Sequence, residues 1–197
     1  MSQILDKASL IAKVLAGSWR QSTSPLTISQ AELDIVTPML LESGAGALGW
    51  KRVSTSSLRT APAALELEQA YRLHALQSAI HERDIENALT LLRSAGVEPI
   101  LVKGWAVARL YPDAGLRPYG DLDLCVAPKQ YHAARRALEK EVNKLFQVDL
   151  HRGFKTLDHK SWDELYTRSH LVQLGEDRKS TRLNSSHIQK SRMPSSA

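Results

Sequence analysis

Residues 99–126 read PILVKGWAVARLYPDAGLRPYGDLDLCV and set the architecture of the second half of the chain. The apolar run 99–102 is typical of a short buried strand, and residues 104–111 have the composition of a helix. Two prolines and two glycines make residues 112–120 a loop. Polar and apolar side chains then alternate over 121–126, which predicts a second strand.

The segment that follows continues the alternation of helices and strands. Pro128 begins a predicted helix that runs to Lys140, and residues 144–151 (KLFQVDLH) predict a third strand. The resulting order of strand, helix, strand, helix and strand fits a small α/β or α+β core.

The first half of the chain predicts helices instead. Apolar residues within 4–15 follow a helical repeat, and Ser29 with Glu32 forms the pattern of a capping box ahead of a second helix. Residues 44–60 are rich in glycine and serine and predict a loop. A long helix is expected over 62–95. Its expected apolar stripe consists of Leu65, Leu73, Leu76, Ile80, Leu89 and Leu92.

Composition places the chain among soluble globular proteins. Its 197 residues are 43% hydrophobic and 24% charged, which is typical of that class. The sequence contains no apolar run that approaches the roughly 18–20 residues of a membrane span. Cys125 is the single cysteine, which excludes an internal disulfide and a zinc site built from cysteines. We therefore expect a cytoplasmic protein with no membrane partner and no disulfides.

The net charge of +5 belongs to the C-terminal end of the chain. Residues 177–197 hold five basic residues and one acid, so residues 1–176 carry a net charge of only +1. This tail has no hydrophobic periodicity, and its first residues, DRKSTRLNSSH, resemble a translated sequencing-library adapter. The alternative is a disordered basic arm that binds phosphates of RNA or of a membrane. We interpret 177–197 as a non-native disordered tail and expect the native chain to be truncated at about Glu176.

Two aspartates open the second predicted strand. The period of two places Asp121 and Asp123 on one face, about 7 Å apart, where they repel each other unless a cation lies between them. Asp149 in the third predicted strand can point to the same place if the two strands are neighbours. Three carboxylates on two strands are typical of a two-metal site for phosphoryl transfer, although a solvated strand face is the alternative. His151 shares the face of Asp149 and either borders the same site or is a structural histidine, and the second is our interpretation.

Residues around the first strand and the loop have two interpretations each. Lys103 and Gly104 join the first strand to a helix, where a phosphate can approach the backbone. The alternative for Lys103 is a surface lysine. Arg117, three residues before Gly120, either binds phosphate or pairs with an acid in its loop. We expect Cys125 to be a core residue.

These residues together resemble the uncharacterised nucleotidyltransferase-like family of the DNA polymerase β superfamily. The resemblance covers about residues 85–175 and rests on four pieces of sequence. These pieces are Val102-Lys103-Gly104, Leu110-Tyr111-Pro112, Arg117 to Leu124, and Asp149-Leu150-His151. The combined pattern is specific, whereas each piece alone is common.

The resemblance implies an α+β fold and a metal centre. A helical N-terminal region (1–95) would precede a small mixed sheet (96–176) with helices on one side. Two Mg²⁺ ions, with Mn²⁺ as a substitute, would be held by the three acids. In the family pattern Asp121 and Asp123 bind the ion that carries the nucleotide, and Asp149 completes the shell of the catalytic ion and helps to deprotonate the acceptor.

The resemblance also implies the substrates. A nucleoside triphosphate, with ATP as the first expectation, would be attacked at its α-phosphate by a hydroxyl group, and pyrophosphate would leave. The residues implied in nucleotide and phosphate binding are Lys103, Gly104, Arg117 and Gly120. The acceptor can be a small molecule, a protein or an RNA, and the sequence leaves this choice open.

Two departures from the superfamily pattern keep alternatives open. Lys103-Gly104 stands where the superfamily at large has Gly-Ser or Gly-Gly, so the serine that commonly contacts the triphosphate is absent. We also expect the helical part that usually follows the core to be missing, because the sequence after about Glu176 resembles an adapter. A catalytically decayed binding or regulatory module is therefore the alternative function. Haloacid-dehalogenase-like phosphatases and nucleotide-sugar glycosyltransferases also carry Asp-x-Asp. The former have the pair at the end of a strand, whereas the acids here open it, and the latter normally need a larger nucleotide-binding domain ahead of the motif.

Overall fold

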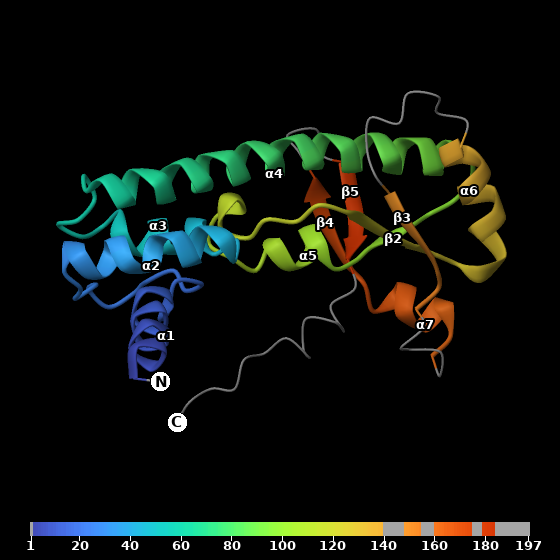
Figure 1. Ribbon diagram of the computed structural model, residues 1–197. Coiled ribbons are helices and arrows are strands. Elements are labelled where there is room, and N and C mark those ends of the chain that lie inside the picture. The colour runs from blue at the N-terminus through green and yellow to red at the C-terminus, as the bar shows by residue number, and fades with distance from the viewer. Residues whose placement is uncertain (1, 140–147, 155–159, 175–178, 184–197) are drawn as a thin grey trace. The chain divides into compact units, whose positions relative to one another are not determined.

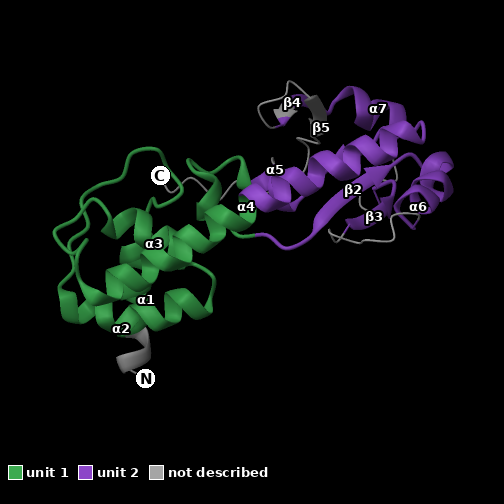
Figure 2. Cartoon of the chain, turned by 90° about the horizontal axis from the view of Figure 1, so that it is seen from above, with its two compact units in different colours: residues 1–78, 108–118 green, residues 79–107, 119–197 purple. Residues whose placement is uncertain are grey.

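The computed structural model describes residues 2–139, 148–154, 160–174 and 179–183 (Figure 1). The chain forms two compact units (Figure 2). Unit 1 comprises residues 1–78 and 108–118, and unit 2 comprises residues 79–107 and 119–197. The division falls inside helix α4 (Pro62–Ser94), because a long helix can contribute one end to each core.

Unit 1 is built from helices. Its elements α1 (Ser2–Leu15), α2 (Gln30–Glu42) and α3 (Gly46–Val53) share one hydrophobic cluster with the first half of α4. Leu33 of α2 and Leu67 of α4 are fully buried in this cluster. The helical N-terminal region that the sequence predicts is therefore confirmed.

The start of α2 carries the predicted capping box. The Ser29 side chain accepts a hydrogen bond from the Glu32 backbone nitrogen at 3.3 Å, and the Glu32 carboxylate accepts one from the Ser29 backbone nitrogen at 2.7 Å. These hydrogen bonds hold the pKa of Glu32 below its usual value. Two backbone donors that the helix leaves without partners are thereby satisfied.

Helix α3 corrects the prediction of a loop over residues 44–60. A Cβ on Gly46 would lie 2.9 Å from Leu41 Cδ2 and 3.0 Å from Ala70 Cβ. Gly49 is similarly close to side chains of its neighbouring helices. Both glycines serve close helix packing, which composition alone does not distinguish from a turn.

Helix α4 buries a different face from the one that the sequence predicts. Leu89 and Leu92 are buried as predicted, but the other members of the stripe are 42% to 60% exposed, namely Leu65, Leu73, Leu76 and Ile80. The hydrophobic residues that α4 does bury recur at helical spacing and are Ala63, Ala64, Leu67, Ile85, Ala88, Leu89 and Leu92. Because several of these residues are alanines, the hydrophobic pattern of this face is weak in the sequence. None of the helices in the described ranges is both long and apolar enough to span a membrane.

Unit 2 holds a five-stranded mixed sheet. Its strands are β1 (Ile100–Leu101), β2 (Leu122–Val126), β3 (Val148–Arg152), β4 (His170–Leu174) and β5 (Lys179–Leu183). They lie in the order β3-β2-β1-β5-β4. β2 is parallel to β3 and antiparallel to β1, β1 is parallel to β5, and β5 is antiparallel to β4. The predicted α+β class with a small mixed sheet is confirmed.

Helices cover one face of this sheet. Leu122 and Leu124 of β2 pack in one cluster with residues of α4, α5 (Gly104–Ala108) and α6 (Tyr131–Glu139). The short 3₁₀ turn η2 (Pro128–Gln130) leads into α6. Because side chains alternate along a strand, this packing fixes which residues of β2 face the other way.

The opposite face carries Asp123 and Cys125 of β2. The short helix α7 (Trp162–Thr167) packs on this side, where Leu165 joins a small cluster with Cys125 and Phe154. This cluster buries Cys125.

Strand β5 lies in the segment that the sequence predicts to be a disordered tail. Residues 179–183 pair with β1 and with β4, which corrects that prediction for these five residues. The pairing uses backbone N–H and C=O groups, which do not depend on the side chains. A strand can therefore form here although the sequence has no hydrophobic periodicity. The non-native origin of 177–197 stays a prediction.

Replacing Gly46 with alanine should destabilise unit 1. The new methyl group would lie 2.9 Å from Leu41 Cδ2. Overpacking costs about 1–3 kcal/mol, of which the better helix propensity of alanine offsets about 1 kcal/mol. We expect a loss of about 1 kcal/mol in the free energy of unfolding, measured by urea denaturation. Gly120→Ala is the matched control, because nothing lies within 4 Å of its added Cβ; equal stability of the two variants would contradict the tight packing of α3.

Candidate functional site

The register of β2 and β3 places two acids side by side. The strands are parallel, with Asp123 opposite Asp149 and Cys125 opposite His151. Paired residues of neighbouring strands point to the same side of a sheet, so these four side chains share the face that α4 does not cover. The second and third predicted strands are thus neighbours, which is the condition for their acids to meet.

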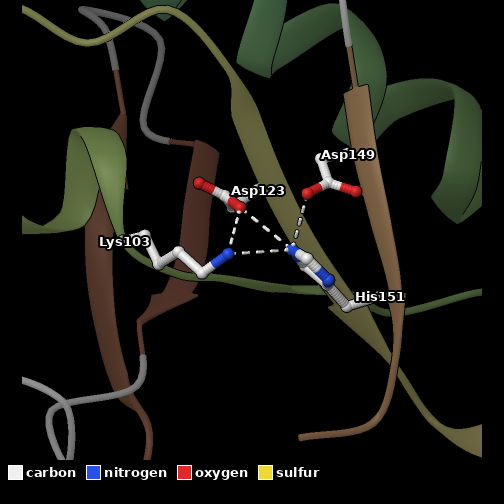
Figure 3. Close-up of polar contacts among 4 residues, drawn as sticks. All are labelled: Lys103, Asp123, Asp149 and His151. Carbon is white, nitrogen blue, oxygen red and sulfur yellow. Dashed lines mark hydrogen bonds and ion pairs between the residues drawn. The ribbon is translucent and has the colours of Figure 1, made fainter. Parts of the chain in front are cut away.

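Four side chains meet on this face, and Figure 3 shows them. Lys103 Nζ donates a hydrogen bond to Asp123 Oδ1 at 2.8 Å, and His151 Nε2 lies 2.9 Å from the same oxygen. His151 Nε2 also lies 3.1 Å from Asp149 Oδ2 and 3.3 Å from Lys103 Nζ. An ammonium group and an imidazole therefore accompany the two carboxylates.

The two carboxylates differ in their exposure to solvent. The Asp123 side chain is 10% exposed, whereas the Asp149 side chain is 55% exposed. A buried charge needs partners, and Asp123 has them in Lys103 and His151. Asp149 therefore lies on the solvent-exposed side of the cluster, and Asp123 lies on its buried side.

The turn between β1 and α5 aims Lys103 at this cluster. Lys103 has φ 51°, in the left-handed region that costs a non-glycine residue roughly 1–2 kcal/mol. Its carbonyl accepts a hydrogen bond from Val107 N at 2.8 Å, which begins α5. At Gly104 an added Cβ would lie 3.1 Å from the backbone oxygen of Asp121, so the two segments approach closely. Strained backbone next to clustered charges is typical of functional sites.

The contacts within the cluster affect its protonation. The hydrogen bond to Asp123 raises the pKa of Lys103, and desolvation by partial burial opposes that rise. His151 Nε2 lies within reach of oxygens of both carboxylates and of Lys103 Nζ, so whether it donates or accepts depends on the tautomer of the ring. Asp123 is partnered by the N–H donor of Lys103 in either case.

Three of these side chains fit a divalent cation. The ligand atoms of Asp123, Asp149 and His151 all lie within 4.8 Å of one another. A metal–ligand distance of about 2.1 Å places neighbouring ligands of an octahedron about 3.0 Å apart. His151 Nε2 lies 2.9 Å and 3.1 Å from the two carboxylate oxygens, so two of the three ligand pairs already have this spacing.

A pocket of about 580 Å³ opens beside the cluster. This volume is within the range of small-molecule sites. Its walls include Val102, Lys103, Tyr131, Asp149, His151 and Arg152. Lys103 and Arg152 supply positive charge for an anionic ligand, and Asp149 supplies an oxygen for its counter-ion.

Three further predicted site residues do not belong to the four-residue cluster. Asp121 precedes β2, is exposed, and does not belong to the group of three possible metal ligands. Gly120 is exposed as well. Arg117 belongs to unit 1, whereas the cluster belongs to unit 2. The roles of these three residues stay predictions.

His151 is the residue whose importance the sequence understated. Its interpretation as a structural histidine does not anticipate its contacts with Lys103, Asp123 and Asp149. The available signal was its position two residues after Asp149, which gives both side chains one face. The sequence does not show that His151 pairs with Cys125 of β2. This pairing brings the imidazole ring next to Asp123.

A family comparison extends the resemblance seen in the sequence. The sequence model of a family described as an uncharacterised nucleotidyltransferase matches residues 30–175. The chain belongs to this family. The match starts at the first residue of α2 and includes β1 to β4, so the family region takes in helices of unit 1 as well as the sheet. Searches of curated proteins and of solved structures returned no match.

The single cysteine reports on packing beside the cluster. In this nucleotidyltransferase-family protein Cys125 is buried, as predicted, and burial raises the pKa of its thiol to about 12. The thiolate is the reactive form, so a higher pKa slows alkylation, although a more basic thiolate is also more nucleophilic. We expect iodoacetamide to react at pH 8 at least about 30-fold more slowly with the folded protein than with the urea-unfolded chain. Equal rates would show that Cys125 is reachable and ionised in the folded state.

Proposed function

We propose that this protein transfers a nucleoside monophosphate from a nucleoside triphosphate, with ATP as the first candidate, to an acceptor hydroxyl, with release of pyrophosphate. The observation that carries the proposal is the pairing of Asp123 with Asp149 in a member of a nucleotidyltransferase family. Phosphoryl transfer depends on positioning and charge neutralisation more than on covalent chemistry by the protein. A paired set of carboxylates beside basic residues suits these needs.

Asp123 and Asp149 would hold the divalent cation that the family implies, either Mg²⁺ or Mn²⁺. When bound, such a cation neutralises charge on phosphate oxygens. The buried Asp123 would fix its position, and the exposed Asp149 would accept the proton of the acceptor hydroxyl. A site with a second ion needs a third acid, and Asp121 is our candidate for it. Residues two apart on an extended chain point to one side, so Asp121 would point to the side of Asp123.

Lys103 would change partners when the substrate binds. In the structure its ammonium donates to Asp123 Oδ1, which is an oxygen that a cation would also bind. Once released from Asp123, Lys103 remains on the wall of the pocket and can donate to oxygens of the triphosphate. We assign Gly104, Arg117 and Gly120 to phosphate binding on the basis of the family resemblance.

Nucleotide binding without transfer is the second candidate function. It is favoured by Lys103, which stands where the superfamily has a small residue and already neutralises part of the charge on Asp123. An ammonium fixed in this way lets the cluster bind phosphate without supporting the reaction. Release of pyrophosphate distinguishes the two functions.

Replacing Asp123 with asparagine tests the proposal. Asparagine keeps the shape of the side chain but removes the charge that a cation needs. We expect ATP with Mg²⁺ or Mn²⁺ to raise the melting temperature of the wild type by about 3–6 °C, and the rise to disappear in the variant. Pyrophosphate release from ATP should fall at least about a hundredfold.

Asp34→Asn is the matched control, because Asp34 is an exposed aspartate of α2 in unit 1. The control should keep both the thermal shift and the release of pyrophosphate. Equal shifts in all three proteins would place nucleotide binding elsewhere and contradict the metal assignment. A thermal shift without pyrophosphate release in the wild type would favour the binding function.

A further inference from the structure

We propose that His151 is a metal ligand and that it makes the site select a first-row transition ion over Mg²⁺. The inference rests on the proposed function, since it concerns the cation of the same site. It goes further because it replaces an all-oxygen site by one with a nitrogen donor. The argument starts from the place of the imidazole between the two acids.

The imidazole occupies the position of a third ligand. Its Nε2 atom is in contact with both Asp123 Oδ1, at 2.9 Å, and Asp149 Oδ2, at 3.1 Å. Both distances match the separation of neighbouring ligands around one ion, about 3.0 Å. The ring comes from β3, in the same strand as Asp149, so the strand geometry holds the two ligands together.

Before a metal can bind, the contacts of His151 Nε2 and of Lys103 Nζ must change. Nε2 must present its lone pair to the metal, with the proton of the neutral ring on Nδ1. Lys103 Nζ must leave Asp123 Oδ1. The ammonium would then turn into the pocket, whose wall Lys103 already lines.

The donor set favours transition ions. Mg²⁺ prefers oxygen ligands and binds through one or two carboxylates, water and phosphates. An imidazole suits first-row transition ions, among which Mn²⁺ has the lowest affinity for a given site. Mn²⁺ is therefore the strictest probe: if it is preferred to Mg²⁺, other members of the series are preferred too.

Electron spin echo spectroscopy of bound Mn²⁺ tests the proposal directly. Inorganic tripolyphosphate takes the place of the nucleotide, because it contains no nitrogen that could be mistaken for imidazole. We expect the echo of the wild type to be modulated by a coordinated histidine nitrogen, and the modulation to vanish in His151→Gln. His132→Gln, at an exposed position of α6, is the matched control and should keep the modulation.

Competition between ions supplies a second readout that needs no activity. Mg²⁺ should displace Mn²⁺ from the wild type only in large excess, and His151→Asp should reduce that excess at least about tenfold, because it restores an all-oxygen site. Bound Mn²⁺ without histidine modulation, or an unchanged excess in His151→Asp, would overturn the proposal and leave the proposed function standing. Failure of the wild type to bind Mn²⁺ with tripolyphosphate would overturn both.

Discussion

Burial of leucines on one face of β2 and β3 forces two aspartates together on the other. Leu122, Leu124 and Leu150 pack in the cluster beneath the helices, and the period of two then turns Asp123 and Asp149 to the open side. A shift of one residue would send these carboxylates into the hydrophobic cluster. The hydrophobic core thus fixes the register, and the register brings like charges together.

Like charges held in this way need a positive partner, and the rest of the site supplies one. Lys103 reaches Asp123 from a strained turn, and His151 contacts both acids from β3. Lys103 and His151 compensate part of the negative charge of the two carboxylates. The proposed divalent cation would complete this compensation, because it can bind oxygens of both acids at once.

Much of this arrangement could be predicted from local sequence patterns. Alternation over 121–126 and the run VDLH indicated the two strands that carry the acids, and Ser29 with Glu32 indicated the start of α2. Features that depend on tertiary packing were not predictable. The burial of alanines along α4, the helix formed by residues 46–53, and the position of His151 beside Asp123 all depend on neighbours that are distant in sequence. Strand β5 depends on backbone pairing, which leaves little trace in side-chain pattern.

The central claim is that a cation binds between β2 and β3, and affinity cleavage by Fe²⁺ tests it most directly. Fe²⁺ bound in place of the natural ion, with ascorbate and hydrogen peroxide, produces radicals that cut the backbone close to the ion. Mass spectrometry should find the cuts within Leu122–Val126 and Val148–Arg152, and excess Mn²⁺ should suppress them. Cuts confined to the helices of unit 1, or cuts in β2 and β3 that persist unchanged when Asp123 and Asp149 are both replaced by asparagine, would contradict the claim.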